Sequence, residues 1–262
     1  MLKKYINIIK YEIILSLKIR ISYKSELITN LALAIASFFL AYYLNQGTSM
    51  MSYYNVNAKQ ESVLFLIGFL FWQVCSLALG YSTSMIRDEA MLGTLEVKIQ
   101  SVFSVPFLLF IRMIISVMSN FICYIVLIVF SVYFMHMEPA DSGYIVLSFL
   151  IMIPSIIGMY GVGLIFACIA LKEKSTGQLI FIVQVLMLIY SNMSSPGAKT
   201  WGNVLPYTSG VEIMRNLYLH QGVEMKLVFL YLVINFIWIF AGVFVMRKMV
   251  KHERTYGSFN QY

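Results

Sequence analysis

The chain has 262 residues, of which 60% are hydrophobic and 12% are charged, and its formal net charge at pH 7 is +7. Soluble domains carry about 25% charged residues, so this chain holds more apolar surface than a single water-soluble core can bury. The composition excludes an ordinary soluble domain. The basic residues stand at the ends of apolar runs, which is typical of membrane topology signals and not of a nucleic-acid-binding groove.

The first 26 residues combine basic charge with apolar bulk. Their apolar residues recur at helical spacing, as Leu2, Ile6, Ile9, Ile13 and Leu17. Most of the lysines fall on the rest of the helical wheel. A basic helix with one apolar stripe lies in the membrane interface and does not cross it, so residues 1–26 predict an interfacial amphipathic helix. A solvated charged tail is the alternative.

Six apolar runs follow, at residues 27–44, 63–81, 103–134, 144–171, 179–190 and 227–246. A crossing helix needs about 20 apolar residues. In lipid a helix satisfies all of its own backbone hydrogen bonds. We therefore predict an all-α polytopic membrane protein, with a six-helix transmembrane domain over residues 27–246 and a tail over residues 247–262.

The orientation of these spans follows from the positive charges outside them. With the N-terminus inside, fifteen Lys and Arg residues fall on the inner side. Only four fall outside, namely Lys59, Lys199, Arg215 and Lys226. Because basic loops stay in the cytoplasm, the sequence predicts a multi-pass protein of the cell membrane with both termini cytoplasmic.

Two segments outside the spans have patterns of their own, and the first is cytoplasmic residues 87–100. Met91, Leu95 and Ile99 repeat every four residues, with charged residues of both signs between them. This spacing predicts a short amphipathic helix with an apolar ridge suited to docking on another protein. A loop helix that rests on the membrane is equally compatible with the pattern.

The second segment is external and covers residues 192–226. Ser209 and Glu212 have the spacing of a capping box, and Gly222 is a suitable helix C-cap. One helical stripe between them is apolar, formed by Val211, Met214 and Leu217. We expect a short extracytoplasmic helical hairpin, partly buried at the outer surface before the last span. A structural lid and a substrate contact are both open interpretations.

Polar residues within the spans are sparse, and they are Gln73, Asn120, Gln184 and Asn235. Lipid offers such groups no hydrogen-bond partner, so they face other helices or a cavity. They either join helices or line a translocation path. No charged residue lies in the middle of a span, and Arg112 is close enough to the cytoplasmic end to extend its charge to the surface.

Signals for an enzyme are nearly absent. The sequence contains no phosphate-binding loop, no zinc-protease motif and no serine-nucleophile motif. Cys75, Cys123 and Cys168 lie singly within apolar runs, so we expect neither a disulfide nor a metal site. The sequence predicts a protein without catalytic residues and without a cofactor, whose energy source is a separate molecule.

Together these features resemble one family, the permease subunits of ABC-2 type transporters. The loop Arg87-Asp88-Glu89, followed by Gly93-Thr94-Leu95-Glu96, looks like the family's acidic loop between spans two and three. The external run that begins at Leu205-Pro206 and reaches Arg215 is similar to the family's segment before the last span. The resemblance covers essentially the whole chain, and it depends on the order and location of these motifs.

The resemblance implies a transport subunit of an ATP-driven exporter for a drug, peptide, lipid or glycan. Two permease subunits, like or unlike, would pair above two cytoplasmic ABC ATPase subunits. The ATPase-coupling residues would be Arg87, Glu89, Met91, Gly93, Thr94, Leu95, Glu96 and Ile99. A non-transporting membrane scaffold or sensor is the alternative, and it needs no ATPase.

Overall fold

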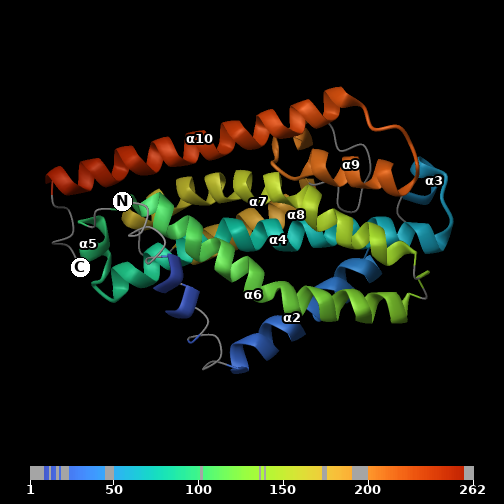
Figure 1. The fold of residues 1–262 in the computed structure, drawn as a ribbon, viewed down its shortest axis with the longest axis horizontal. Helices are drawn as coiled ribbons and strands as arrows, with labels where there is room; N and C mark the ends of the chain where they lie inside the picture. Colours follow the sequence, from blue (N-terminus) through green and yellow to red (C-terminus); the bar gives the residue numbers. More distant parts are fainter. Residues whose placement is uncertain are drawn as a thin grey trace.

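The computed structural model shows a bundle of long helices that lie side by side (Figure 1). It describes residues 9–11, 13–15, 18, 24–44, 50–100, 103–135, 137–138, 140–172, 176–190 and 200–256. Within these residues every regular element is a helix, which confirms the predicted all-α class. The interfacial helix predicted over residues 1–26 lies largely outside the described residues.

The helices follow one another along the chain with short connections. They are α2 (Lys24–Leu44), α3 (Met50–Tyr54), α4 (Ala58–Met91), α5 (Leu95–Ile99), α6 (Val105–Phe134), α7 (Asp141–Lys172), α8 (Thr176–Tyr190), the 3-10 helix η1 (Thr200–Val204), α9 (Thr208–Tyr218) and α10 (Met225–Tyr256). In Figure 1, α5 lies at one end of the bundle and α3 and α9 lie at the other.

Four of these helices, α4, α6, α7 and α10, are long and apolar enough to cross a membrane. At 1.5 Å per residue the 30 residues of α6 extend about 45 Å, which exceeds the roughly 30 Å of a bilayer's hydrocarbon core. The predicted spans at 27–44 and 179–190 correspond to α2 and α8, whose apolar parts are shorter. Helices that are long and apolar enough to span a membrane are therefore present, and the count of six crossings stays a prediction.

Helix α7 lies against both α4 and α10, and glycines allow the backbones of these helices to approach closely. A Cβ atom added at Gly161 would lie 2.3 Å from the carbonyl oxygen of Trp238. One added at Gly242 would lie 2.1 Å from the carbonyl oxygen of Gly161, and one at Gly163 would lie 2.6 Å from that of Leu79. Any side chain at these positions would force the helices apart, because small residues are what allows such close packing in membranes.

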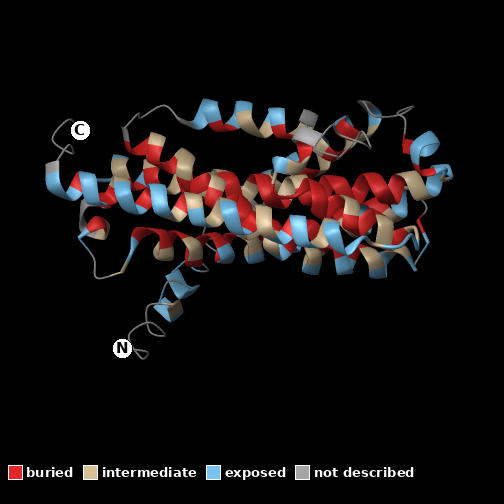
Figure 2. Ribbon diagram, turned by 90° about the horizontal axis from the view of Figure 1, so that it is seen from above, coloured by how far each residue is buried: buried red, intermediate tan, exposed pale blue. Residues whose placement is uncertain are grey.

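The buried residues concentrate on the inner helices and the exposed residues on the outer ones (Figure 2). Many of the exposed residues are large and apolar. On α10 the exposed apolar row is Phe229, Phe236, Phe240 and Phe244. Such a row is unfavourable in water and suits lipid or a second membrane subunit. The core of the bundle is thus formed by α4 and α7, and α6 and α10 form much of its apolar surface.

The single helix predicted over residues 87–100 is wrong, because α4 continues to Met91 and then stops. Gly93 has a φ of +68°, a left-handed conformation that glycine adopts without steric cost. The N–H of Thr94 donates to the carbonyl of Glu89 at 3.0 Å, and the N–H of Gly93 donates to that of Ala90 at 3.2 Å. This pair of bonds is the Schellman arrangement that ends a helix, and α5 begins directly after it.

The break also divides the predicted apolar ridge. Met91 is 74% exposed, whereas Leu95 and Ile99 are 1% and 3% exposed and belong to the hydrophobic core. Leu92, beside Met91, is 76% exposed. The surface available for docking is therefore the loop tip at Met91 and Leu92.

The predicted capping box at Ser209 is also wrong. Helix α9 begins at Thr208, and its N-cap residue Tyr207 makes no side-chain cap bond. Ser209 lies inside the first turn, where its hydroxyl is buried without a hydrogen-bond partner. The Glu212 carboxylate accepts a hydrogen bond from Tyr54 instead. Tertiary packing therefore sets the start of this helix.

The other end of α9 differs from the prediction as well. His220, and not Gly222, takes the left-handed conformation after the helix, with a φ of 55°. The N–H of Gln221 donates to the carbonyl of Asn216 at 2.9 Å, which again is a Schellman bond. The expected short outer helix is nevertheless present, with Val211 and Met214 fully buried.

Candidate functional site

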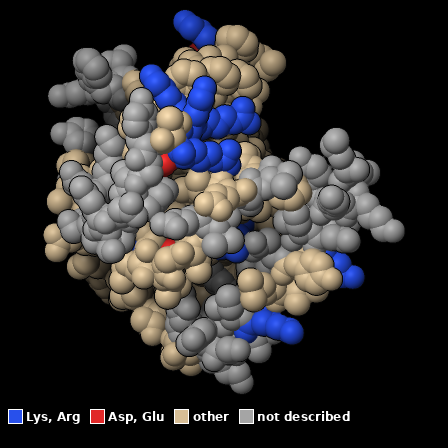
Figure 3. Space-filling view, turned by 90° about the vertical axis from the view of Figure 1, so that its left-hand side faces the viewer, with Lys and Arg blue, Asp and Glu red and all other residues tan. Residues whose placement is uncertain are grey.

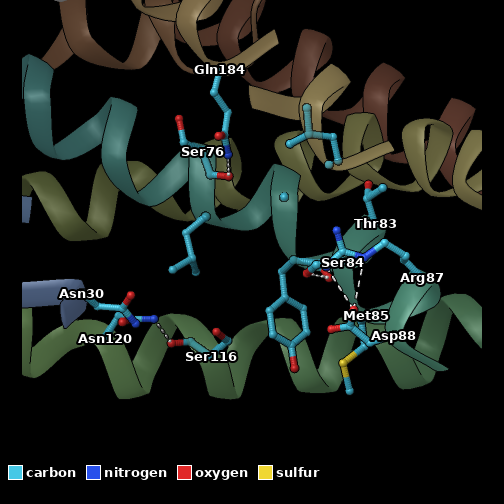
Figure 4. A pocket seen from close by; sticks show the side chains of 15 residues that line it. Asn30, Ser76, Thr83, Ser84, Met85, Arg87, Asp88, Ser116, Asn120 and Gln184 are labelled. Atoms are coloured by element: carbon cyan, nitrogen blue, oxygen red, sulfur yellow. Dashed lines mark hydrogen bonds and ion pairs between the residues drawn. The ribbon is translucent and has the colours of Figure 1, made fainter. Parts of the chain in front are cut away.

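A polar cavity of about 480 Å³ lies along α4, between α6 and α8 and near α2 (Figure 4). Its polar lining residues include Asn30, Ser76, Thr83, Ser84, Arg87, Asp88, Ser116, Asn120 and Gln184. In Figure 4, Asn30 and Asn120 lie at one end of the group, and Arg87 and Asp88 lie at the other. The cavity is thus a polar site within a bundle whose outer surface is apolar.

Helical spacing on α4 forms the floor of this cavity. Ser76, Gly80, Ser84 and Asp88 recur every four residues and so lie on one face of the helix. Gly80 leaves room for a neighbour on α8, because a Cβ atom there would lie 3.2 Å from Nε2 of Gln184. The absence of a side chain at this glycine allows an amide to approach the α4 backbone.

Hydrogen bonds hold the amide groups of the cavity wall in place. Nε2 of Gln184 donates to the Ser76 carbonyl at 2.9 Å, and Nε1 of Trp72 donates to the Gln184 carbonyl at 3.1 Å. Nδ2 of Asn120 donates to the Ser116 carbonyl at 2.9 Å. Two of these bonds use the side-chain amide N–H groups of Gln184 and Asn120, so the side-chain oxygens of these two residues remain available as acceptors.

One further polar group in the wall is buried. The Ser76 hydroxyl has no hydrogen-bond partner in the described structure. A buried hydroxyl without a partner costs roughly 1–3 kcal/mol.

The structure brings only two of the four predicted path residues into the cavity. Asn120 and Gln184 line it, and Gln73 on α4 does not. Asn235 lies on α10, where Nδ2 donates to the carbonyls of Pro206 at 2.9 Å and Tyr231 at 2.7 Å. Asn235 therefore joins α10 to the segment before α9. Of the two interpretations open from the sequence, this contact favours a residue that joins helices.

A buried ion cluster lies where α4, α5 and α6 meet. Glu89 is 6% exposed, and its Oε1 accepts from Nη1 of Arg112 at 2.7 Å and from Nζ of Lys98. Arg112 therefore does not extend to the surface as the sequence suggested. Arg112 and Glu89 are 23 residues apart in the sequence, so no local pattern indicates that they pair. Only the packing of α6 on α4 brings the two side chains together.

The remaining predicted coupling residues lie around this cluster. Arg87 pairs with Asp88 at 3.1 Å and lines the cavity. Gly93 forms the turn, and the Thr94 hydroxyl donates to the Glu89 carbonyl at 3.4 Å. The side chain of Glu96 lies outside the described residues. The loop is thus fixed from behind by the ion cluster and exposed at its tip.

The same end of the bundle is rich in Lys and Arg, as Figure 3 shows. Helix α10 continues beyond its apolar span to Tyr256 and carries four exposed basic residues there, Arg247, Lys248, Lys251 and Arg254. Arg254 also donates to the carbonyl of Ile99. We call this the basic end of the bundle.

The opposite end buries a single cation on α9. Arg215 is fully buried, and its Nε and Nη2 donate to the Leu64 carbonyl at 3.3 and 3.2 Å. Its guanidinium lies 5.9 Å from the centre of the Tyr54 ring. Burial raises the pKa of Tyr54, Arg215 opposes that shift and Glu212 adds to it, so this tyrosine is neutral at physiological pH. The motif before the last span thus serves to anchor α9.

These features define a helical membrane protein with a polar cavity between its helices, next to a buried ion cluster. No protein-family model matches the chain, and no curated protein matches it significantly.

Proposed function

We propose that this chain is the transmembrane permease subunit of an ATP-driven exporter of the ABC-2 type. One observation carries the proposal: α4 forms both the floor of the polar cavity and the exposed loop tip at the basic end. A protein that bound the tip at Met91 and Leu92 would act on the cavity through one continuous helix. That is the connection a transport subunit needs between its motor and its substrate path.

The chemistry of the loop tip supports a cytoplasmic protein partner. Two large apolar side chains, Met91 and Leu92, are about three-quarters exposed beside the exposed carboxylate of Asp88. Behind them, Glu89 is held by cations from two other helices. A tip that is apolar outside and fixed inside can transmit force, because the contact does not deform the loop.

The energetic basis of transport would be differential binding. Binding of ATP to two ATPase subunits would draw the loop tips of two permease subunits together and change the access to the cavity. The substrate moves only if the two states differ in their affinity for it. The amide and hydroxyl groups of the cavity and its Arg87–Asp88 pair fit a substrate with hydrogen-bonding groups, such as a drug, peptide, glycan or lipid headgroup.

The test uses a double variant of the loop tip, Met91→Asp with Leu92→Asp. Both positions are exposed, so the permease should fold normally, whereas a charge placed in an apolar contact costs several kcal/mol. The tagged variant is purified from its native membranes, and the rate of ATP hydrolysis that copurifies with it is measured. We expect this rate to be at least about tenfold lower than for the wild-type chain. The matched control is Met225→Asp, at the first residue of α10, which is 80% exposed and lies at the opposite end of the bundle.

The outcomes separate the candidate functions. Loss of ATP hydrolysis in the tip variant alone supports the transport subunit. Wild-type hydrolysis in both variants would show that the loop does not couple. If the wild-type chain itself brings down no ATPase, the membrane scaffold or sensor becomes the better interpretation.

A further inference from the structure

Two adjoining cavities lie at the basic end, and none of the described residues that line them belongs to α8. The first has a volume of about 360 Å³ and lies between α6, α7 and α10. The second has a volume of about 500 Å³ and lies between the start of α6 and the basic part of α10. They share Phe103, Ser104, Pro106 and Arg247, so they form one continuous depression.

The two halves of this depression differ in chemistry. The inner half is lined by aromatic and aliphatic side chains, among them Phe107, Phe110, Ile157, Ile239 and Val243. The outer half is lined by three cations, Arg247, Lys251 and Arg254. No acidic residue is among the described residues that line either half. The depression therefore suits a molecule with one apolar and one anionic end.

Its position along α10 matches the boundary of a bilayer. From Ile239 to Arg254 the helix rises about 22 Å, and the lining changes from apolar to basic at Arg247. Membrane helices place such a change at the level of the lipid headgroups. An acyl chain would lie along Ile239 and Val243 while its phosphate lay among the basic side chains.

Ring contacts and one hydrogen bond connect the walls of the inner half. The rings of Phe103 and Phe107 stack with their centroids 6.4 Å apart, and Phe110 packs on Tyr160 at 5.3 Å. The Tyr160 hydroxyl donates to the Pro106 carbonyl, which fixes the start of α6 against α7. At the rim, the Ser104 side chain makes no cap bond to α6, so its hydroxyl can donate to a phosphate oxygen.

We propose that this depression is a binding site for one anionic phospholipid, such as phosphatidylglycerol, at the basic end of the bundle. Basic pockets between transmembrane helices recognise anionic headgroups, and each Lys or Arg near the surface strengthens the attraction. The combined volume lies within the roughly 300–1,000 Å³ typical of small-molecule sites. The site needs neither an ATPase nor a transported substrate, so it stands apart from the proposed transport function.

The first experiment tests the headgroup. The purified, delipidated chain is mixed with equal amounts of phosphatidylglycerol and phosphatidylcholine, and bound lipid is counted by native mass spectrometry. We expect wild type to retain phosphatidylglycerol preferentially. Arg247→Gln with Lys251→Gln should reduce that preference about thirtyfold. The control, Lys59→Gln with Lys226→Gln, removes two exposed charges elsewhere and should leave it unchanged. An equal loss in both pairs would overturn the site.

The second experiment tests the acyl chain. Val243→Trp fills the inner half and should reduce phosphatidylglycerol binding roughly tenfold, because apolar contacts of the chain are lost. Phe240→Trp, at a position that is 67% exposed on the same helix, is the matched control and should bind as wild type does. If Val243→Trp lowers the melting temperature, the smaller insertion Ile239→Phe replaces it.

A soluble headgroup distinguishes a lipid from free phosphate. Glycerol 1-phosphate at millimolar concentration should not displace the lipid, since it lacks the acyl chain. If it displaces the lipid fully and Val243→Trp binds like wild type, the depression is a phosphate site and the lipid proposal is wrong.

Discussion

Each end of the bundle buries charge, and the two ends hold it in different ways. At the basic end, the Glu89 carboxylate accepts hydrogen bonds from two cationic side chains, one on α5 and one on α6. At the opposite end, Arg215 donates to a backbone carbonyl of α4 and lies near the ring of Tyr54. The basic end thus holds its buried charge through side chains of three helices, and the opposite end anchors α9 to the backbone of α4.

This difference agrees with the proposed division of work in a transporter. The end that would contact a motor has an exposed loop tip, a turn at Gly93 and a side-chain ion cluster. The other end is closed by α9, which packs against α4, α7 and α10. Movement applied at the first end would be resisted at the second, so the cavity between them would change its shape.

The largest expected effect is all-or-none and fixes which end faces the cytoplasm. Cysteines introduced at Leu92 and Thr255 should not react with an impermeant thiol reagent in intact cells, whereas those at Gly143 and Gly222 should. All four positions are exposed. The native thiols Cys75, Cys123 and Cys168 are buried, so they should add little background labelling. Labelling of the Leu92 position from outside would reverse the orientation.

The next effect concerns the ion cluster of the basic end. Glu89→Ala removes the carboxylate from Arg112, whose side chain is only 10% exposed. Removing one partner of a buried pair costs about 3–5 kcal/mol. We expect a clear fall in the melting temperature of the purified protein and weaker protection of the loop against protease.

Two controls test the cause of that loss. Asp88→Ala removes the neighbouring carboxylate, which is 54% exposed and pairs with Arg87, and should cost no more than about 1 kcal/mol. Glu89→Ala combined with Arg112→Met removes the buried pair and leaves only Lys98, whose side chain is 25% exposed, so it should recover most of the stability. A double variant as unstable as the single one would show that packing, and not charge, explains the effect.

A smaller effect is expected at the anchoring end. Arg215→Met keeps an apolar stem of similar length but removes both hydrogen bonds to the Leu64 carbonyl. Hydrogen bonds to charged groups contribute about 1.5–3 kcal/mol, so α9 should open more often while the core stays intact. Hydrogen exchange of the α9 amides measures this opening. Lys226→Met, at an exposed basic residue in the first turn of α10, should leave the exchange unchanged.

The sequence predicted the features that depend on local periodicity. The helical class and the apolar runs follow from composition and spacing, because lipid requires long apolar helices. The buried stripe of α9 at Val211 and Met214 was predicted from residues three apart. Two of the four path residues, Asn120 and Gln184, do line the cavity.

What the sequence could not predict depends on contacts between distant residues. The pairing of Glu89 with Arg112 and the contact of Arg215 with Leu64 join positions on different helices. The depression that we propose binds a lipid likewise forms only because α6 and α10 lie beside each other. The break at Gly93 had a local signal, the glycine itself, but the four-residue repeat across it suggested a continuous helix.

The smallest expected effect separates a sequence rule from the packed structure. The capping-box pattern predicts that Ser209→Ala loosens α9 by about 1 kcal/mol. In the structure the Ser209 hydroxyl is buried without a partner, so its removal should change the stability of α9 by nearly zero or raise it slightly. Thr208→Val is the matched control one residue earlier. The Thr208 hydroxyl bonds to the carbonyls of Gly202 and Leu205, so its loss should cost roughly 1 kcal/mol. Hydrogen exchange of α9 in both variants decides between the two explanations, and a larger effect at Ser209 than at Thr208 would restore the capping box.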